Sequence, residues 1–301
     1  MQPDEGYVTT EDGVRLYFRI LGEGPSTVLF PNGFDLLDDF RYLAGDRRLA
    51  VFDLRNRGFS DPVQDASKLK AGVHNDVEDL EAVRRHLGAD AIDILGHSYV
   101  GLTVALYAIK HGARVRRVVQ LGPTGPFPAK QYPEPLSFAD GTLQEVFAAL
   151  EPLRKERGSA DPVELCRRFW SVLRRIYVAD AADADRIRWG RCDLPNERGF
   201  MSYWMEHVWP SLLGLNLTAE EIAGVAVPVL TVHGMKDRSA PYGGGREWAL
   251  LLPEARLVTV RNGAHAPWIE APEQVFGAIE TFLNGAWPEG AEAVGSLEIH
   301  A

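Results

Sequence analysis

Short apolar runs that alternate with helical patterns are the feature that most restricts the fold of this chain. The runs TVLF, LAVF, AIDIL and VRRVVQL, between residues 27 and 121, are typical of buried strands, and a partly alternating run at Arg15–Leu21 precedes them. Helical patterns at about residues 75–87 and 100–110 separate the later runs. Because strands that alternate with helices form parallel sheets covered on both faces, we predict an α/β fold with a mostly parallel, doubly wound sheet.

One long insertion interrupts this alternation. The pattern stops after GPTGP at residues 122–126 and resumes with VPVLTV at 227–232, a helix near 245–252, a strand at 256–260 and a helix near 272–283. The intervening segment has helical periodicity and no convincing strand. We therefore expect a core domain of residues 1–122 and 225–285, an inserted helical cap at 123–224, and a loosely ordered tail at 286–301.

Composition excludes several classes of function. With 32 Lys and Arg against 42 Asp and Glu, the formal charge of −10 makes nucleic acid an unexpected partner. We expect no membrane association, because the chain has no apolar run long enough to span a bilayer, and the acidic first residues do not resemble a secretory signal. The two cysteines, Cys166 and Cys192, are too few for a disulfide framework, so we expect reduced thiols and a cytoplasmic location.

A candidate nucleophile stands in the segment GHSYVG. The triplet G-x-S occurs three times in the chain, but only the copy at residues 96–98 directly follows a buried strand and opens a long apolar helix. That context is typical of a nucleophile elbow, in which a sharp strand-to-helix turn exposes the serine oxygen. The start of the helix also offers free N–H groups to developing negative charge. Ser98 is therefore our candidate nucleophile.

A serine nucleophile needs a base, and the base needs an orienting acid. Asp237 follows the strand VPVLTV, and His265 follows the strand RLVTV. Because parallel strands end at the same edge of a sheet, we expect both side chains to lie near Ser98. We interpret the other histidines, His97 and His233 among them, as packing or surface residues.

With these motifs, residues 7–283 resemble the α/β-hydrolase family. The segment DLRNRGFSD at residues 53–61 is similar to the family's D-x-R-G-x-G-x-S motif, and PNGF at 31–34 stands where the family has its oxyanion loop. The resemblance implies a Ser98, Asp237 and His265 triad, with the backbone N–H groups of Phe34 and Tyr99 forming the oxyanion hole. We expect no metal or other cofactor, because the sequence has no metal-binding motif and no G-x-G-x-x-G after its first strand.

The sequence departs from the family pattern at several places. Asn32 replaces a usual histidine, and Asn56 replaces a usual glycine. Val100 stands where the family has a small residue, so it is expected to crowd the elbow. The stretch between Gly33 and the strand near Leu49 is short, which predicts a short first crossover helix.

The insertion suggests an aromatic substrate pocket. Four of the chain's seven tryptophans lie in it, and they serve either the pocket or the cap's own core. We expect the pocket to be lined by Trp170, Trp204, Glu206 and Trp268. Acids in the cap bind a substrate amino group in the related proline iminopeptidases, although the H-G-G-P-G and G-G-S-W-G motifs of that branch are missing here.

The sequence therefore predicts a serine hydrolase that cleaves a small to medium carboxylic ester through an acyl-enzyme on Ser98. A proline iminopeptidase-like aminopeptidase is the first alternative, and a non-catalytic receptor for a small-molecule ligand is the second. Acyl transfer, perhydrolysis and C–C bond cleavage use the same triad, so the sequence does not separate them from ester hydrolysis. Nor does it indicate an oligomeric state.

Overall fold

The fold is built on an eight-stranded sheet. The computed structural model describes residues 4–33, 35–156, 160–196 and 202–299. Within these residues the strand order is β1-β2-β4-β3-β5-β6-β7-β8. The strands are β1 (Asp4–Thr9), β2 (Arg15–Leu21), β3 (Thr27–Pro31), β4 (Arg48–Phe52), β5 (Ile92–His97), β6 (Val115–Leu121), β7 (Val229–Gly234) and β8 (Ala255–Val260).

Most of the sheet is parallel. The pairs β1·β2 and β2·β4 are antiparallel, and every pair from β4·β3 to β7·β8 is parallel. All residues of β3, β5 and β7 are buried, because helices cover both faces of the sheet. This confirms the predicted mostly parallel, doubly wound sheet.

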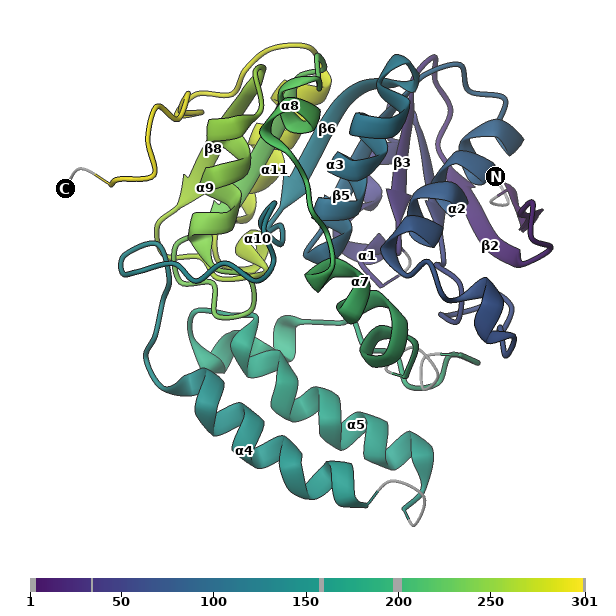
Figure 1. Ribbon diagram of the computed structural model, residues 1–301, viewed down its shortest axis with the longest axis vertical. Helices are drawn as coiled ribbons and strands as arrows, with labels where there is room; N and C mark the ends of the chain where they lie inside the picture. Colours follow the sequence, from purple (N-terminus) through teal and green to yellow (C-terminus); the bar gives the residue numbers. More distant parts are fainter. Residues whose placement is uncertain (1–3, 34, 157–159, 197–201, 300–301) are drawn as a thin grey trace.

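Helices pack on both faces of the sheet (Figure 1). Buried side chains of α2, α3 and α9 form one cluster with the sheet, and those of α1 and α11 form another. The first crossover is short, as predicted, because α1 is followed only by a 3-10 turn at Arg41–Ala44. The described helices are α1 (Leu37–Phe40), α2 (Val73–His86), α3 (Tyr99–His111), α4 (Thr142–Lys155), α5 (Pro162–Leu173), α7 (Trp209–Leu213), α8 (Ala219–Ala223), α9 (Tyr242–Leu251), α10 (Pro267–Glu270) and α11 (Pro272–Leu283). None of them is long and apolar enough to cross a membrane.

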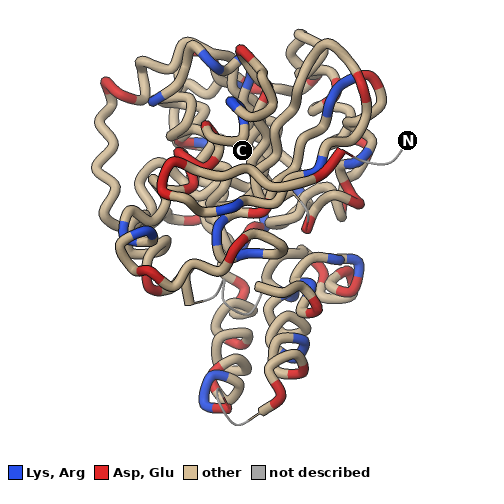
Figure 2. The backbone as a smooth tube through the Cα atoms, turned by 90° about the vertical axis from the view of Figure 1, so that its right-hand side faces the viewer, with Lys and Arg blue, Asp and Glu red and all other residues tan. Residues whose placement is uncertain are grey.

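The insertion, residues 122–228, lies between β6 and β7. Its first two helices, α4 and α5, project away from the sheet side by side (Figures 1 and 2). Both helices carry acidic and basic residues, and Arg168 on α5 forms a bidentate ion pair with Glu156 just after α4. The end of the insertion returns to the core, where Ser211 Oγ accepts a hydrogen bond of 2.8 Å from the N–H of Val73 at the start of α2.

A disulfide joins the two cysteines of the insertion, so the expectation of reduced thiols is wrong. The Cα atoms of Cys166 and Cys192 are 5.8 Å apart. Packing brings them together, because Trp170, one turn beyond Cys166 on α5, covers Gly190, where a Cβ would lie only 2.2 Å from the indole ring. Disulfides persist mainly in oxidising compartments, so this bond does not support the predicted cytoplasmic location.

The described part of the C-terminal tail lies against the sheet, whereas we expected a loosely ordered segment. Glu292 exchanges two backbone hydrogen bonds of 2.8 Å with Leu257 of β8. The guanidinium of Arg246 on α9 donates to the carbonyl groups of Ser296 and Glu298. A single buried arginine with several N–H donors thus fixes the path of a segment that has little apolar periodicity.

Candidate active site

Ser98 lies in a sharp turn between β5 and α3. Its backbone has φ 62° and ψ −130°, a strained conformation for a residue other than glycine, and such strain is typical of active sites. A Cβ at Gly96 would lie 2.4 Å from the carbonyl oxygen of Val100, and one at Gly101 would lie 2.9 Å from Pro123. The crowding therefore falls on positions 96 and 101, whereas Val100 packs in the core.

Asp237 and His265 are in contact on the loops that follow β7 and β8. Nδ1 of His265 is 2.8 Å from Oδ2 of Asp237, and both side chains are buried. Oδ1 of Asp237 accepts hydrogen bonds of 2.8 Å from the N–H groups of Ser239 and Ala240. Because an ionised carboxylate only accepts, Nδ1 of His265 carries a hydrogen and Nε2 keeps a lone pair that can take up a proton.

The electrostatics of this pair favour an ionised acid. Burial alone would raise the pKa of Asp237, but the charge of His265 and the hydrogen bonds from His233 and His265 outweigh burial. Together they hold the pKa of Asp237 well below its ordinary value. An ionised Asp237 can stabilise a positive charge on His265.

Ser98 follows β5, and β6 lies between β5 and β7 in the sheet. The N–H of Ser98 donates to the carbonyl of Leu121, the last residue of β6. Gly122, which follows Leu121, has φ 48°, and a Cβ there would lie 3.3 Å from both Nδ1 of His265 and Oδ2 of Asp237. On the other side, Nε2 of His97 is 2.9 Å from the backbone oxygen of His265. Burial, with the adjacent His265, keeps the pKa of His97 well below its ordinary value, so this ring stays neutral. The structure thus gathers Ser98, Asp237 and His265 at the carboxyl edge of the sheet.

The residues expected to form the oxyanion hole are only partly described. Tyr99 is the first residue of α3, directly after Ser98, and Phe34 lies outside the described residues. Next to Phe34, Asp35 forms a buried ion pair with Arg57. Asn32 has φ 56°, a left-handed conformation that asparagine tolerates better than most residues.

Aromatic rings surround His265, and two of them were not predicted. The ring of Tyr177, just after α5 in the chain, stacks on His265 with centroids 5.2 Å apart. The ring of Trp189 in turn stacks on Tyr177, with centroids 5.0 Å apart. Trp268 lies 5.0 Å from His97 and donates from Nε1 to Asp39. Tryptophan count pointed to the insertion in general, but no sequence signal placed Tyr177 beside His265.

His233 was also missed. It is the fifth residue of β7 and was interpreted as a packing or surface residue, yet its Nε2 is 3.1 Å from Oδ2 of Asp237. Its spacing of four residues from Asp237 is the only signal that could have indicated this contact.

Comparison with known proteins places this geometry in a family. The sequence profile of the alpha/beta hydrolase fold matches residues 26–272. The chain belongs to the α/β-hydrolase fold family. This α/β-hydrolase is 26% identical over 279 residues to the bifunctional esterase/perhydrolase DCH of Acinetobacter calcoaceticus, a match that covers 88% of this chain and 95% of the relative.

A peptidase and a second esterase are also similar to this α/β-hydrolase. A proline iminopeptidase of Heyndrickxia coagulans is 24% identical over 306 aligned positions and covers 93% of this chain and 98% of the relative. The crystal structure of the esterase RhEst1 from a Rhodococcus species superposes with a TM-score of 0.68 at 21% identity and covers 95% of this chain and 99% of the other. That structural likeness supports the fold.

The residues expected to line the substrate pocket of this α/β-hydrolase occupy different environments. Trp204 contacts Tyr99, beside the elbow, with ring centroids 4.7 Å apart. Trp170 packs in the insertion's own buried cluster and contacts Tyr177, with ring centroids 6.4 Å apart. Glu206 is exposed on a π-helical turn, Trp204–Val208.

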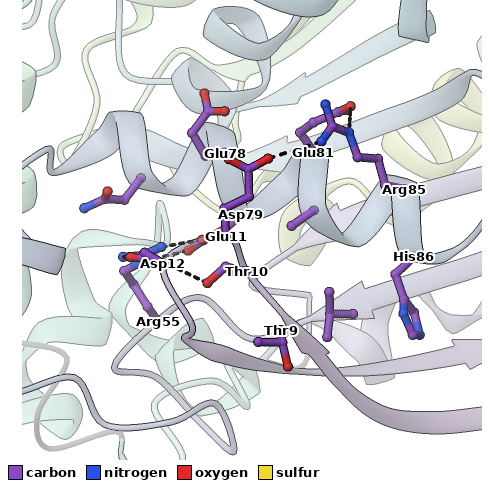
Figure 3. A pocket seen from close by; sticks show the side chains of 13 residues that line it. Thr9, Thr10, Glu11, Asp12, Arg55, Glu78, Asp79, Glu81, Arg85 and His86 are labelled. Carbon is purple, nitrogen blue, oxygen red and sulfur yellow. Dashed lines mark hydrogen bonds and ion pairs between the residues drawn. The ribbon is translucent and has the colours of Figure 1, made fainter.

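A cavity of about 600 Å³ lies elsewhere, between the start of the chain and α2 (Figure 3). Arg55 pairs with Asp12 at one end of it, and Glu81 pairs with Arg85 at the other. None of its lining residues follows β5, β7 or β8, so it is separate from the candidate active site. Among the described residues, no group of three or more His, Cys, Asp or Glu is placed to hold a metal ion.

Proposed function

We propose that this α/β-hydrolase is a serine hydrolase that cleaves a small to medium carboxylic ester through an acyl-enzyme on Ser98. The observation that carries the proposal is the buried Asp237–His265 hydrogen bond of 2.8 Å, next to a serine held at φ 62° in a strand-to-helix turn. This is the arrangement that activates a serine hydroxyl. The esterase names among the relatives support the choice of an ester.

In the proposed mechanism Ser98 Oγ attacks the ester carbonyl carbon while Nε2 of His265 takes its proton. The oxyanion receives hydrogen bonds from the backbone N–H groups of Tyr99 and Phe34. The intermediate collapses as His265 returns the proton to the leaving alcohol, and the acyl group remains on Ser98. Water then attacks the acyl-enzyme, passes a proton through His265 to Ser98, and releases the carboxylic acid.

We assign residues 123–224 the role of a cap that shapes the pocket. The stack of Tyr177 on His265 supports this role, because the insertion then covers one face of the base and limits its contact with water. Arg238, next to Asp237, fastens the same segment by donating to the carbonyl oxygens of Val178 and Ala179. In this proposal Trp204 and Trp268 are pocket walls, Trp170 supports Tyr177 from behind, and Glu206 stands at the rim.

The intact mass of the protein after exposure to a small fluorophosphonate tests the nucleophile. We expect one adduct on the wild type and none on Ser98→Ala, together with a fall of roughly 10⁴- to 10⁶-fold in ester turnover, as for other serine hydrolases. A folded wild-type protein that takes up no adduct and turns over no ester would favour the receptor alternative instead.

A matched pair of substrates tests the aminopeptidase alternative, which the proline iminopeptidase relative favours. An aryl ester and an aminoacyl amide with the same acyl group are compared on wild type and Glu206→Gln. Ester cleavage that Glu206→Gln leaves intact supports an esterase. Amide cleavage that needs both a free substrate amino group and Glu206 would assign the aminopeptidase activity.

A further inference from the structure

A second histidine contacts the acid of the candidate active site. His233 is fully buried at the end of β7, with Nε2 at 3.1 Å from Oδ2 of Asp237 and 3.0 Å from the carbonyl oxygen of Ala240. Both neighbours of this nitrogen are acceptors. Nε2 of His233 therefore carries a hydrogen and donates to both.

The carboxylate of Asp237 is consequently held by four N–H groups. Two backbone donors, from Ser239 and Ala240, bind Oδ1, and two imidazoles, His265 at 2.8 Å and His233 at 3.1 Å, share Oδ2. A donor on an anionic oxygen lowers its basicity. The hydrogen bond from His233 thus weakens the hold that Asp237 has on the proton of His265, and it fixes the direction in which Oδ2 points.

Helix α9 is shaped to accept the His233 ring. A Cβ at Gly245 would lie only 2.1 Å from Nδ1 of His233. Glycine inside a helix costs about 1 kcal/mol relative to alanine, so the absence of a side chain here has a packing reason. Tyr242 packs edge-on against the ring with centroids 5.8 Å apart, and its hydroxyl bonds to Thr259 rather than to His233.

We propose that His233 is a positioning residue, which orients the Asp237 carboxylate and sets how strongly it holds the proton of His265. The inference rests on the proposed roles of Asp237 and His265. Among the described residues, the other titratable groups that face this pair are His97, with its ring 4.5 Å from that of His265, and Tyr177, which stacks on His265. Both belong to other elements and stay unchanged in the variants below.

Three variants separate the hydrogen bond from the packing. His233→Met removes the donor and fills the space, whereas His233→Gln keeps an N–H near the position of Nε2. Gly245→Ala keeps the histidine at position 233 but displaces its ring, because the added Cβ would lie 2.1 Å from Nδ1. Tyr242→Phe is the matched control, because it alters a packing neighbour of the ring and leaves the hydrogen bond to Asp237 in place.

We expect the value of kcat/KM to fall about 10- to 100-fold in His233→Met, the range for loss of a hydrogen bond to a charged group, and severalfold at most in His233→Gln. The acid limb of the kcat/KM profile should move to higher pH by roughly half to one unit in His233→Met and Gly245→Ala, because the freed Oδ2 binds the protonated His265 more strongly. Tyr242→Phe should keep the wild-type profile.

The low-field proton resonance of Nδ1–H in His265 gives a readout that needs no turnover. It should shift further downfield in His233→Met than in His233→Gln. The proposal would be overturned if the resonance and the acid limb of kcat/KM were unchanged in His233→Met. It would also be overturned if His233→Met and His233→Gln shifted both readouts equally. If His233→Met does not fold, His233→Gln and Gly245→Ala decide by the same readouts. A wild type without adduct or ester turnover would refute the proposed function, while the resonance would still test the role of His233.

Discussion

At the scale of single residues, the turn at Ser98 depends on Gly96, two residues before the serine, and on Gly101, three residues after it. A Cβ at Gly96 would lie within 2.4 Å of a backbone oxygen, so Gly96→Ala must move the turn that carries the serine. We expect fluorophosphonate labelling of Ser98 to slow at least tenfold in Gly96→Ala. Val100→Ala should instead lower the free energy of unfolding by about 1–3 kcal/mol through lost packing and keep the labelling rate within twofold. Equal labelling of the two variants would contradict this assignment.

Residue-scale prediction from sequence works where a side chain follows a recognisable strand. Asp237 and His265 were proposed because each follows an apolar run, and the structure places them in contact. His233 lies inside such a run, where a histidine is expected to pack, and its contact depends on the turn that brings residue 237 back toward β7. Tyr177 depends on how the insertion folds over the sheet, which no local pattern encodes.

At the scale of elements, one carboxylate joins α2 to α3. Glu81 accepts hydrogen bonds from Arg84 and Arg85 on its own helix and from the Tyr107 hydroxyl on α3. Burial works against the charge, but these bonds lower the pKa of Glu81 from 4.5 to about 2. The ionised form therefore adds stability that is present above pH 4.5 and is lost as the pH falls through 2.

This linkage predicts a pH-dependent difference between wild type and Glu81→Gln. The shift corresponds to about 3 kcal/mol of unfolding free energy near pH 6, and the difference should shrink toward zero near pH 2. Urea denaturation across this range measures it, with Glu273→Gln, an exposed carboxylate on α11, as control. A difference that stayed constant from pH 6 to pH 2 would show that Glu81 contributes packing only.

Elements with strong periodicity could be predicted, and the weakly patterned ones could not. The strands β2 and β6 and the helix α11 agree with the sequence to within a residue or two, because each buries a regular set of apolar side chains. The edge strand β1 was missed because only Val8 of its six residues is buried. Its hydrogen bonds to β2, which sequence patterns do not reveal, define it instead.

At the scale of the whole molecule, the insertion has a small buried cluster of its own and a covalent link. Cys166 on α5 and Cys192 close a loop of 26 residues that contains Trp170 and Tyr177, so the bond restrains the segment that covers His265. No sequence pattern pairs two isolated cysteines, since their proximity arises only after α5 and the segment near Gly190 pack together.

The disulfide should therefore stabilise the insertion more than the sheet. For a loop of this length the chain-entropy relation gives about 3.5 kcal/mol. Alkylation of the native protein before reduction should add no mass, and reductant should then separate an early transition of the insertion from the main thermal transition. A Cys166→Ala, Cys192→Ala double variant should show that early transition without reductant. Adding reductant should not change its thermal transitions. Two alkyl adducts on the untreated native protein would exclude the disulfide. If the bond restrains Tyr177 over His265, the double variant will also show a higher KM while its rate of fluorophosphonate labelling at Ser98 does not fall.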